Sequence, residues 1–277
     1  MAMQPITLTG GMRANLVSLQ NTNSLLELTQ KKLATGKKVN SALDDPVAYF
    51  TAVAHEQRAG DLSGRKDEMS EAVQTVKAAD AGIQSINTLI AAARSLATSA
   101  LSADSTTATT LMNQFNTVRA QIDEMAGDSG YKGVNLLGGT SVALTVKFDE
   151  TGASKLGITG FDASTSASGL NIATAAWVSG TSITSTAIDA SITSLDTAKD
   201  TLRTQSSKLA NNLSIITARQ EFTQGMINVL KDGAAGLTNA DMNEEGANML
   251  MLQTRQALGT TSLSLASQAA QSVLRLF

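Results

Sequence analysis

Few residues of this 277-residue sequence could carry out catalysis or bind a metal. The sole histidine is His55, and the sequence contains no cysteine. Without cysteine there is no thiol nucleophile, disulfide, zinc finger or iron–sulfur cluster. A lone histidine, with no second one to share a metal, is more typical of a solvated or interface position. We therefore expect no enzyme activity, no metal and no cofactor.

Two pairs of adjacent carboxylates could suggest acid–base chemistry. Asp44 and Asp45 stand directly before Pro46. A carboxylate at the N-cap and a proline at the first helical position together favour the start of a helix, so we interpret this pair as helix capping. Glu244 and Glu245 are interpreted as solvated charges on a helix or in its first turn.

Glycine and lysine clusters give no stronger sign of ligand chemistry. Gly138 and Gly139 lack the Lys-Ser or Lys-Thr of a phosphate loop and are interpreted as a turn. The basic residues between Lys31 and Lys38 are typical of a solvated turn, with an interface to an acidic neighbour as the alternative. A net charge of −3 argues against nucleic-acid binding, and no apolar run is long enough to span a membrane, so we expect neither partner.

Apolar residues recur at alternating spacings of three and four in four long stretches, which predicts long amphipathic helices. Gly127 and Gly233 stand where we expect helices to end. The stripes are Met12, Leu16, Leu19, Asn23, Leu26, Gln30 and Leu33; Met69 to Ala97, continued after a break by Leu111 to Met125; Ile188 to Leu230; and Met249, Leu252, Leu263, Ala266, Ala270, Val273 and Phe277.

The middle of the chain differs from these stretches in its apolar spacing and composition. Residues 141–148 alternate apolar and polar, which predicts a strand, and residues 151–190 are rich in hydroxyls and poor in charge. The predicted fold is mainly α: an elongated rod of long antiparallel helices with a terminal coiled coil and a small β-hairpin and loop excursion in the middle. Helices that run out and back place the two chain ends together.

Three ordered strings resemble bacterial flagellins. The first is residues 32–46, KLATGKKVNSALDDP, which is similar to the flagellin pattern basic-Leu-Ser-Ser-Gly-x-x-Ile-Asn-x-Ala-x-Asp-Asp. GYKGVNLLGG, residues 130–139, resembles the family's Phe-Asn-Gly-x-Asn-Leu-Leu segment, and residues 240–277 resemble its C-terminal helix. The resemblance covers roughly residues 1–139 and 186–277, while the segment 69–73 departs from the family pattern.

The resemblance implies a division of the chain into four parts. Residues 1–33 with 240–277 would form a coiled-coil filament core, 34–45 a spoke linker, 46–139 with 186–239 a helical rod domain, and 140–185 a short surface-exposed segment. The spoke motif comprises Gly36, Asn40, Asp44 and Asp45. The residues expected to pack in the filament core are Leu16, Leu19, Leu26, Leu33, Leu258, Leu263, Leu265, Val273, Leu276 and Phe277.

The function implied is that of a structural subunit that polymerises into the flagellar filament used for swimming. The alternatives are a hook–filament junction protein of the same superfamily and a surface adhesin or glycan-binding protein. Expected partners are further copies of the chain, with other flagellins as possible co-assembling subunits, an export chaperone, and the filament cap and hook-junction proteins. The N-terminus does not resemble a cleavable signal, so export through the flagellar type III apparatus to the extracellular filament is expected.

The hydroxyl-rich middle segment offers candidate O-glycosylation sites at Thr181, Ser182, Thr184, Ser185 and Thr186, with unmodified polar loops as the alternative. Trp177 lies in the same segment. Because a large apolar ring is costly to expose, we expect Trp177 to be buried against its own chain or a neighbouring subunit.

Overall fold

The computed structural model describes residues 10–274, which form five α-helices and two small β-hairpins. Leu276 and Phe277 lie outside the described residues, and the side chain of Val273 is not described. The chain divides into two compact units, Met1–Gln57 with Val229–Phe277 and Arg58–Asn228. The mainly α fold with a small β excursion is confirmed.

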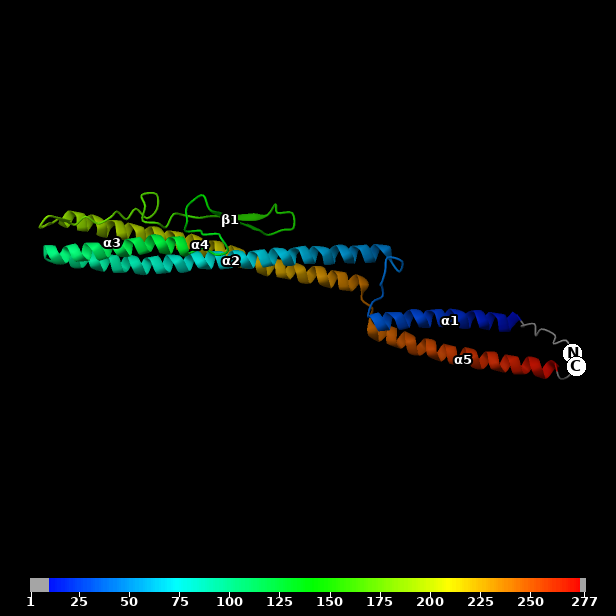
Figure 1. The fold of residues 1–277 in the computed structure, drawn as a ribbon. Coiled ribbons are helices and arrows are strands. Elements are labelled where there is room, and N and C mark those ends of the chain that lie inside the picture. The colour runs from blue at the N-terminus through cyan, green and yellow to red at the C-terminus, as the bar shows by residue number, and fades with distance from the viewer. Residues whose placement is uncertain (1–9, 275–277) are drawn as a thin grey trace. The chain divides into compact units, whose positions relative to one another are not determined.

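The first unit contains the terminal helices. Helix α1 (Gly10–Thr35) and helix α5 (Met242–Leu274) run side by side in opposite directions (Figure 1). The unit also holds the start of α2 (Pro46–Ala100) and the end of α4 (Ser185–Thr238). The expectation that the two ends of the chain run together is therefore confirmed for the described parts of these helices.

The second unit contains the remainder of α2 and α4 together with α3 (Ser105–Asp128). The break expected within the second apolar stripe falls after Ala100. Asp104 then begins α3, because its side chain accepts hydrogen bonds from the backbone N–H groups of Thr106 and Thr107 at 3.0 Å each.

The β structure is confined to the segment between α3 and α4. Strand β1 (Ala143–Lys147) pairs antiparallel with β2 (Lys155–Thr159), with Thr145 opposite Gly157. Strands β3 (Val178–Ser179) and β4 (Ser182–Ile183) form a second, minimal hairpin around Gly180, whose φ of 66° suits a tight turn. The strand predicted at 141–148 is confirmed.

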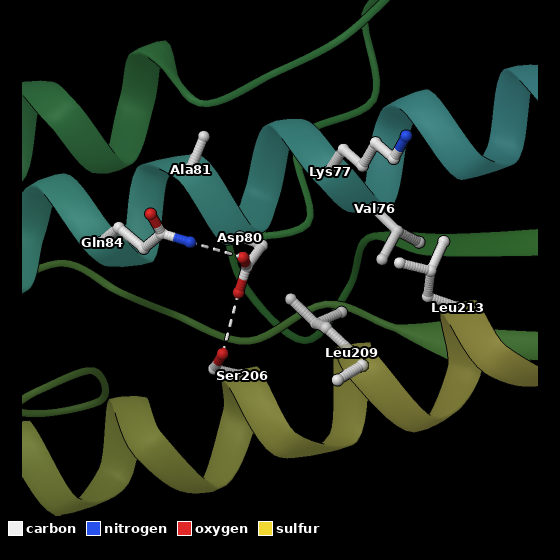
Figure 2. Close-up of a pocket in the computed structure, with 9 residues that line it drawn as sticks. Val76, Lys77, Asp80, Ala81, Gln84, Ser206, Leu209 and Leu213 are labelled. Atoms are coloured by element: carbon white, nitrogen blue, oxygen red, sulfur yellow. Dashed lines mark hydrogen bonds between the residues drawn. The ribbon is translucent and has the colours of Figure 1, made fainter.

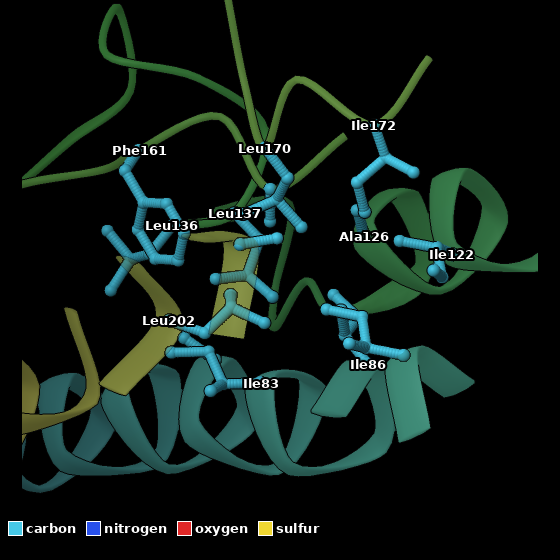
Figure 3. Close-up of a cluster of buried hydrophobic side chains, with 14 of the residues drawn as sticks. Ile83, Ile86, Ile122, Ala126, Leu136, Leu137, Phe161, Leu170, Ile172 and Leu202 are labelled. Carbon is cyan, nitrogen blue, oxygen red and sulfur yellow. The ribbon is translucent and has the colours of Figure 1, made fainter. Parts of the chain in front are cut away.

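A continuous hydrophobic core fills the second unit. Ile83 and Ile86 of α2 meet Ile122 and Ala126 of α3 in this core, and leucines 136 and 137 join them from the turn that follows α3 (Figure 3). Each of these side chains is at most 3% exposed. The turn brings its two leucines here because Asn135 donates through Nδ2 to the carbonyls of Ala126 and Gly127 at the end of α3.

Residues 163–177 form a loop that contributes to the same core, although its sequence shows no regular apolar spacing. Side chains of α3 bind its backbone: Asn116 exchanges two hydrogen bonds with Ala175, and Arg119 donates from Nε to the Ile172 carbonyl at 2.8 Å. Buried apolar side chains of the segment, Leu170, Ile172 and Trp177, then pack inward.

Trp177 is fully buried within its own chain. Its ring lies edge-on to Phe115 at 4.9 Å between centroids, and its Nε1 donates to Ser191 Oγ at 3.0 Å. Of the two packing alternatives expected from the sequence, the internal one is confirmed.

The predicted helix end at Gly233 is wrong, whereas the one predicted at Gly127 lies one residue before the observed end of α3. Helix α3 continues to Asp128 and α4 continues to Thr238, five residues beyond Gly233. Neither glycine has a positive φ, so neither acts as a left-handed C-terminal residue. Gly233 instead lies beside His55 of α2, where a Cβ would be 3.8 Å from the imidazole Cδ2.

Candidate assembly surface

The two terminal helices pack along one antiparallel seam. Polar pairs fix its register: Asn15 Nδ2 donates to Ser262 Oγ at 3.3 Å, and Gln256 Nε2 donates to Asn23 Oδ1 at 2.8 Å. Between these pairs Leu19 faces Gly259, whose missing side chain lets the helices approach closely, because a Cβ there would lie 3.0 Å from Leu19 Cγ. Residues that come later in α1 thus contact residues that come earlier in α5, as in any antiparallel pair.

A salt bridge closes the seam near the end of α1 and the start of α5. Lys32 Nζ lies 2.8 Å from Glu245 Oε1, and the two side chains are only 25% and 11% exposed. Of the two interpretations of Glu245, a solvated helix face is wrong because the residue is 8% exposed, whereas a charge in the first turn of a helix is confirmed. Lys32 faces an acidic residue, as the alternative interpretation of the basic cluster expected. The first turn of α5 is capped by Asp241, whose Oδ1 accepts from the N–H groups of Asn243 and Glu244.

The seam uses only part of the apolar surface of these helices. Nine large apolar side chains of α1 and α5 are between 39% and 67% exposed in the single chain. Met251, Leu258 and Leu265 recur every seven residues, so they lie along one side of α5, away from Leu252, which is 5% exposed. The others are Leu16, Val17, Leu25, Leu28, Met242 and Leu250.

The residues expected in the filament core therefore fall into separate groups. Leu19, Leu26, Leu33 and Leu263 are partly buried positions of α1 and α5. Leu16, Leu258 and Leu265 are 39%, 66% and 61% exposed, so nothing in the single chain covers them fully. In the predicted stripe of α1 Met12 is buried but Leu16 is exposed, and the buried Thr29 was not part of that stripe.

The predicted spoke motif joins the terminal helix pair to α2 through a network of backbone contacts. Gly36, with a φ of 70°, ends α1 by donating from its N–H to the Lys32 carbonyl at 2.8 Å. Its own carbonyl accepts from the N–H of Ala240 at 2.9 Å. The N–H groups of Lys38 and Val39 donate to the Thr238 carbonyl, so the spoke residues 36–39 pair with residues 238–240, which the sequence motif did not include.

The two spoke carboxylates have different tasks. Asp45 caps α2 by accepting from the N–H of Ala48 at 3.0 Å, as expected. Asp44 instead accepts from the N–H groups of Asn40 and Ser41 at 2.9 and 3.0 Å, which fixes the turn before the helix. The hydrogen bond from Asn40 is the main cause that holds the pKa of Asp44 below its ordinary value, with Ser41 and Lys31 acting in the same direction.

The five candidate glycosylation residues lie around the second hairpin and the start of α4. Thr181 and Ser182 stand at and beside the β3–β4 turn, Thr184 precedes α4, and Ser185 and Thr186 are the first residues of α4. All five are exposed, so their hydroxyls are accessible from solvent.

A hollow between α2 and α4 in the second unit shows no catalytic arrangement. It measures about 240 Å³, and Asp80 is the carboxylate in its lining. Both oxygens of Asp80 are engaged, one by Ser206 Oγ and one by Gln84 Nε2, each at 2.8 Å (Figure 2). The carboxylate therefore links the two helices.

The described part of the chain holds neither a metal-binding cluster nor a helix that could span a membrane. Residues 10–274 contain no cluster of three histidine or acidic side chains arranged to hold a metal ion. Within the same range, no helix combines the length and apolarity that a membrane span requires.

Comparisons with known proteins agree with this arrangement. Residues 11–142 match the family model of the bacterial flagellin N-terminal helical region, and residues 185–277 match that of the C-terminal helical region. Flagellin FljK of Caulobacter vibrioides is 29% identical over 279 residues, covering all of both chains. A flagellin of Brucella melitensis is 26% identical over 268 residues, covering 95% of each chain.

A crystal structure of Bacillus cereus flagellin gives a TM-score of 0.46 at 18% identity, covering 56% of this chain and 88% of that chain. The two family models together leave unmatched only the first ten residues and the segment 143–184, which contains both hairpins. The chain belongs to the bacterial flagellin family and is a structural subunit of the flagellar filament.

Proposed function

We propose that the exposed apolar side of the α1–α5 pair is the surface by which subunits pack into the filament core. The observation that carries the proposal is the set of nine large apolar side chains on these two helices that remain 39% to 67% exposed. Fully burying one leucine is worth about 1.5–3 kcal/mol, so completing the burial of several per subunit, repeated at each neighbour, can hold a polymer without covalent links.

The proposed roles of the chain's parts follow from this surface. Residues 1–33 with 240–277 form the core, 34–45 form the spoke, and 46–139 with 186–239 form the helical domain that packs between neighbouring subunits. The exposed residues of the segment 140–185 face solvent, whereas its buried side chains, Trp177 among them, pack into the core of the second unit, so the segment is not wholly surface-exposed as the sequence predicted. Packing of Val273, Leu276 and Phe277 in the core belongs to the same proposal.

Polar substitutions on the exposed side of α5 test the proposal. Leu258→Gln with Leu265→Gln changes side chains that the chain itself leaves more than 60% exposed, so the free subunit keeps its helix content. The concentration needed for polymerisation, measured by sedimentation after seeding, should rise at least tenfold. Leu101→Gln is the matched control, since Leu101 is 43% exposed but lies outside the terminal helices. Equal polymerisation of all three proteins contradicts the proposal.

The route to the filament is proposed as export through the flagellar type III apparatus without removal of a leader. The absence of cysteine supports this route, because no disulfide can trap a chain that must travel unfolded. An export chaperone covers the apolar side of α5 in the cytoplasm by a helix-in-groove mode, and the cap and hook-junction proteins contact the filament ends. Mass spectrometry of extracellular filaments should find the first thirty residues retained, and their loss would disprove this route.

Thr181, Ser182, Thr184, Ser185 and Thr186 are proposed O-glycosylation sites. Their support is their exposure and the lack of charged neighbours between residues 163 and 186. Peptide mapping of native filaments should find hexose-scale mass additions on peptides that contain these residues. Unmodified peptides at full coverage would leave the segment as bare polar loops.

A further inference from the structure

A hollow of about 190 Å³ lies in the second unit where the β1–β2 turn meets α2 and α4. Its apolar walls come from Leu62, Phe148, Phe222 and Met226. Phe222 is 59% exposed, whereas Phe148 is 8% exposed. A cavity of about 150 Å³ can hold a benzene ring, so this hollow has room for one large apolar side chain.

One cation of the hollow has no carboxylate partner among the described residues. Arg58 Nε is held 2.6 Å from Glu150 Oε1, and Asp149 accepts hydrogen bonds from Thr151 and Ser154 within its own turn. The Arg219 guanidinium lies 5.2 Å from the centroid of the Phe148 ring, and no acidic side chain in the described part of the chain lies within 4 Å of it. The hollow thus offers apolar walls and one cation available to an incoming carboxylate.

The first unit carries a short stretch with complementary chemistry. Leu43 is 96% exposed, Val47 76% and Phe50 61%, so three large apolar side chains within eight residues are left to solvent. Asp45 stands among them and uses Oδ1 to accept from the Ala48 N–H, while its side chain remains at the surface. The contacts of the single chain therefore leave these three apolar side chains exposed, together with the Asp45 carboxylate beside them.

We infer that the knob, Leu43, Val47 and Phe50 of one subunit, packs at the Arg219 hollow of the next subunit and inserts one of its side chains there, with Asp45 facing Arg219. A second copy is the occupant that fits because it brings apolar side chains and a carboxylate together, and every copy carries both halves of the contact. Two different patches on one chain make a head-to-tail contact, which propagates along a polymer instead of closing into a dimer. The inference rests on the proposed polymerisation and adds a second surface to the terminal helices.

Cysteine cross-linking tests this contact directly, because the parent chain has no cysteine. A disulfide requires Cα atoms about 4.4–6.8 Å apart, so cross-links report close contact. Filaments of the Leu43→Cys, Phe222→Cys double variant should yield a ladder of dimers, trimers and longer oligomers on oxidation. A mixture of the two single variants should yield dimers only, and each single variant alone should stay monomeric on a denaturing gel.

The charge contribution is tested in the same background. Arg219→Glu should slow formation of the ladder several-fold, whereas Arg203→Glu, which removes an exposed partner of Asp200 on the same helix, should not. Equal rates for the two variants would overturn the pairing of Asp45 with Arg219.

The outcomes separate this contact from the wider proposal. Filaments that form normally but give no ladder, or give one with Leu43→Cys and Val229→Cys in place of Phe222→Cys, overturn the head-to-tail contact alone. A parent chain that never polymerises under seeding overturns the proposed packing surface and this inference together.

Discussion

Leu19 of α1 packs directly over Gly259 of α5, at a point where any side chain on α5 would have to displace it. A Cβ built on Gly259 lies 3.0 Å from Leu19 Cγ and 3.3 Å from its Cδ2. Glycine inside a helix costs about 1 kcal/mol relative to alanine, so its presence here is compensated by the close approach of the two helices. The terminal helices are thus fitted to each other along the seam, while nine large apolar side chains of the two helices remain exposed.

This contact predicts different effects for two glycine substitutions in the same helix. Gly246→Ala should stabilise α5 of the free chain by about 1 kcal/mol, and so raise its helix content and midpoint of thermal unfolding, because a Cβ there meets nothing within 4 Å. Gly259→Ala should gain less or lose stability, since Leu19 must move. Circular dichroism and amide exchange over residues 242–274 measure both. Equal gains would show that α1 and α5 are not paired as described.

The single tryptophan reports on the second unit alone. Trp177 is fully buried against Phe115 in the single chain, so its emission should already be blue-shifted in the free subunit. Polymerisation should leave the emission maximum unchanged within a few nanometres. Emission like that of free tryptophan in the monomer, or a large blue shift on assembly, would contradict the internal packing of residues 163–177.

Truncating Phe115 should destabilise the second unit strongly. Phe115 is fully buried, and replacing a buried phenylalanine with alanine typically costs about 3–5 kcal/mol. Phe222→Ala is the matched control, because the ring is 59% exposed and its removal should change the unfolding free energy of the monomer by about 0.5 kcal/mol or less. Urea unfolding of the free chains measures both, and comparable losses would refute the core assignment.

The cap of α3 predicts acid sensitivity. The hydrogen bonds from the Thr107 N–H and hydroxyl, joined by that from the Thr106 N–H, hold the pKa of Asp104 below its ordinary value of 3.8. A lowered folded-state pKa means that the stabilisation is complete above pH 3.8 and is lost as the pH falls through the lower, folded value. Asp104→Asn keeps an acceptor but does not titrate.

The thermal midpoints of the parent and Asp104→Asn should therefore differ at pH 7 and converge below pH 3.8. Calorimetry of the two monomers between pH 7 and 2 measures the difference. A gap that stays constant over this range would show that Asp104 contributes no ionised cap.

Periodicity predicted the long helices because their buried positions recur regularly, as with Leu195, Leu202, Leu209 and Ile216 of α4. Apolar periodicity did not predict the end of α4 or the buried polar position in α1. Gly233 continues a helix because the neighbouring turns of α4 stay bonded around it, and Thr29 takes a buried position that a search for apolar residues overlooks.

Contacts between distant segments were beyond the sequence patterns. Lys32 and Glu245 are separated by more than two hundred residues, and the attachment of Ala175 to Asn116 depends on how the loop folds over α3. The spoke motif was located by resemblance, yet its pairing with residues 238–240 was not, because an antiparallel bridge of one residue leaves no alternation to detect.

Polymerisation of a chain that lacks residues 258–277 tests most directly whether the terminal helices hold the filament together. The deletion removes exposed Leu258 and Leu265 together with Gly259, while the described second unit, Arg58–Asn228, is left intact. We predict a soluble, largely helical monomer with the blue-shifted Trp177 emission of the parent, and no filaments by electron microscopy after seeding with sheared filaments. Filaments of normal appearance from this truncated chain would contradict this prediction.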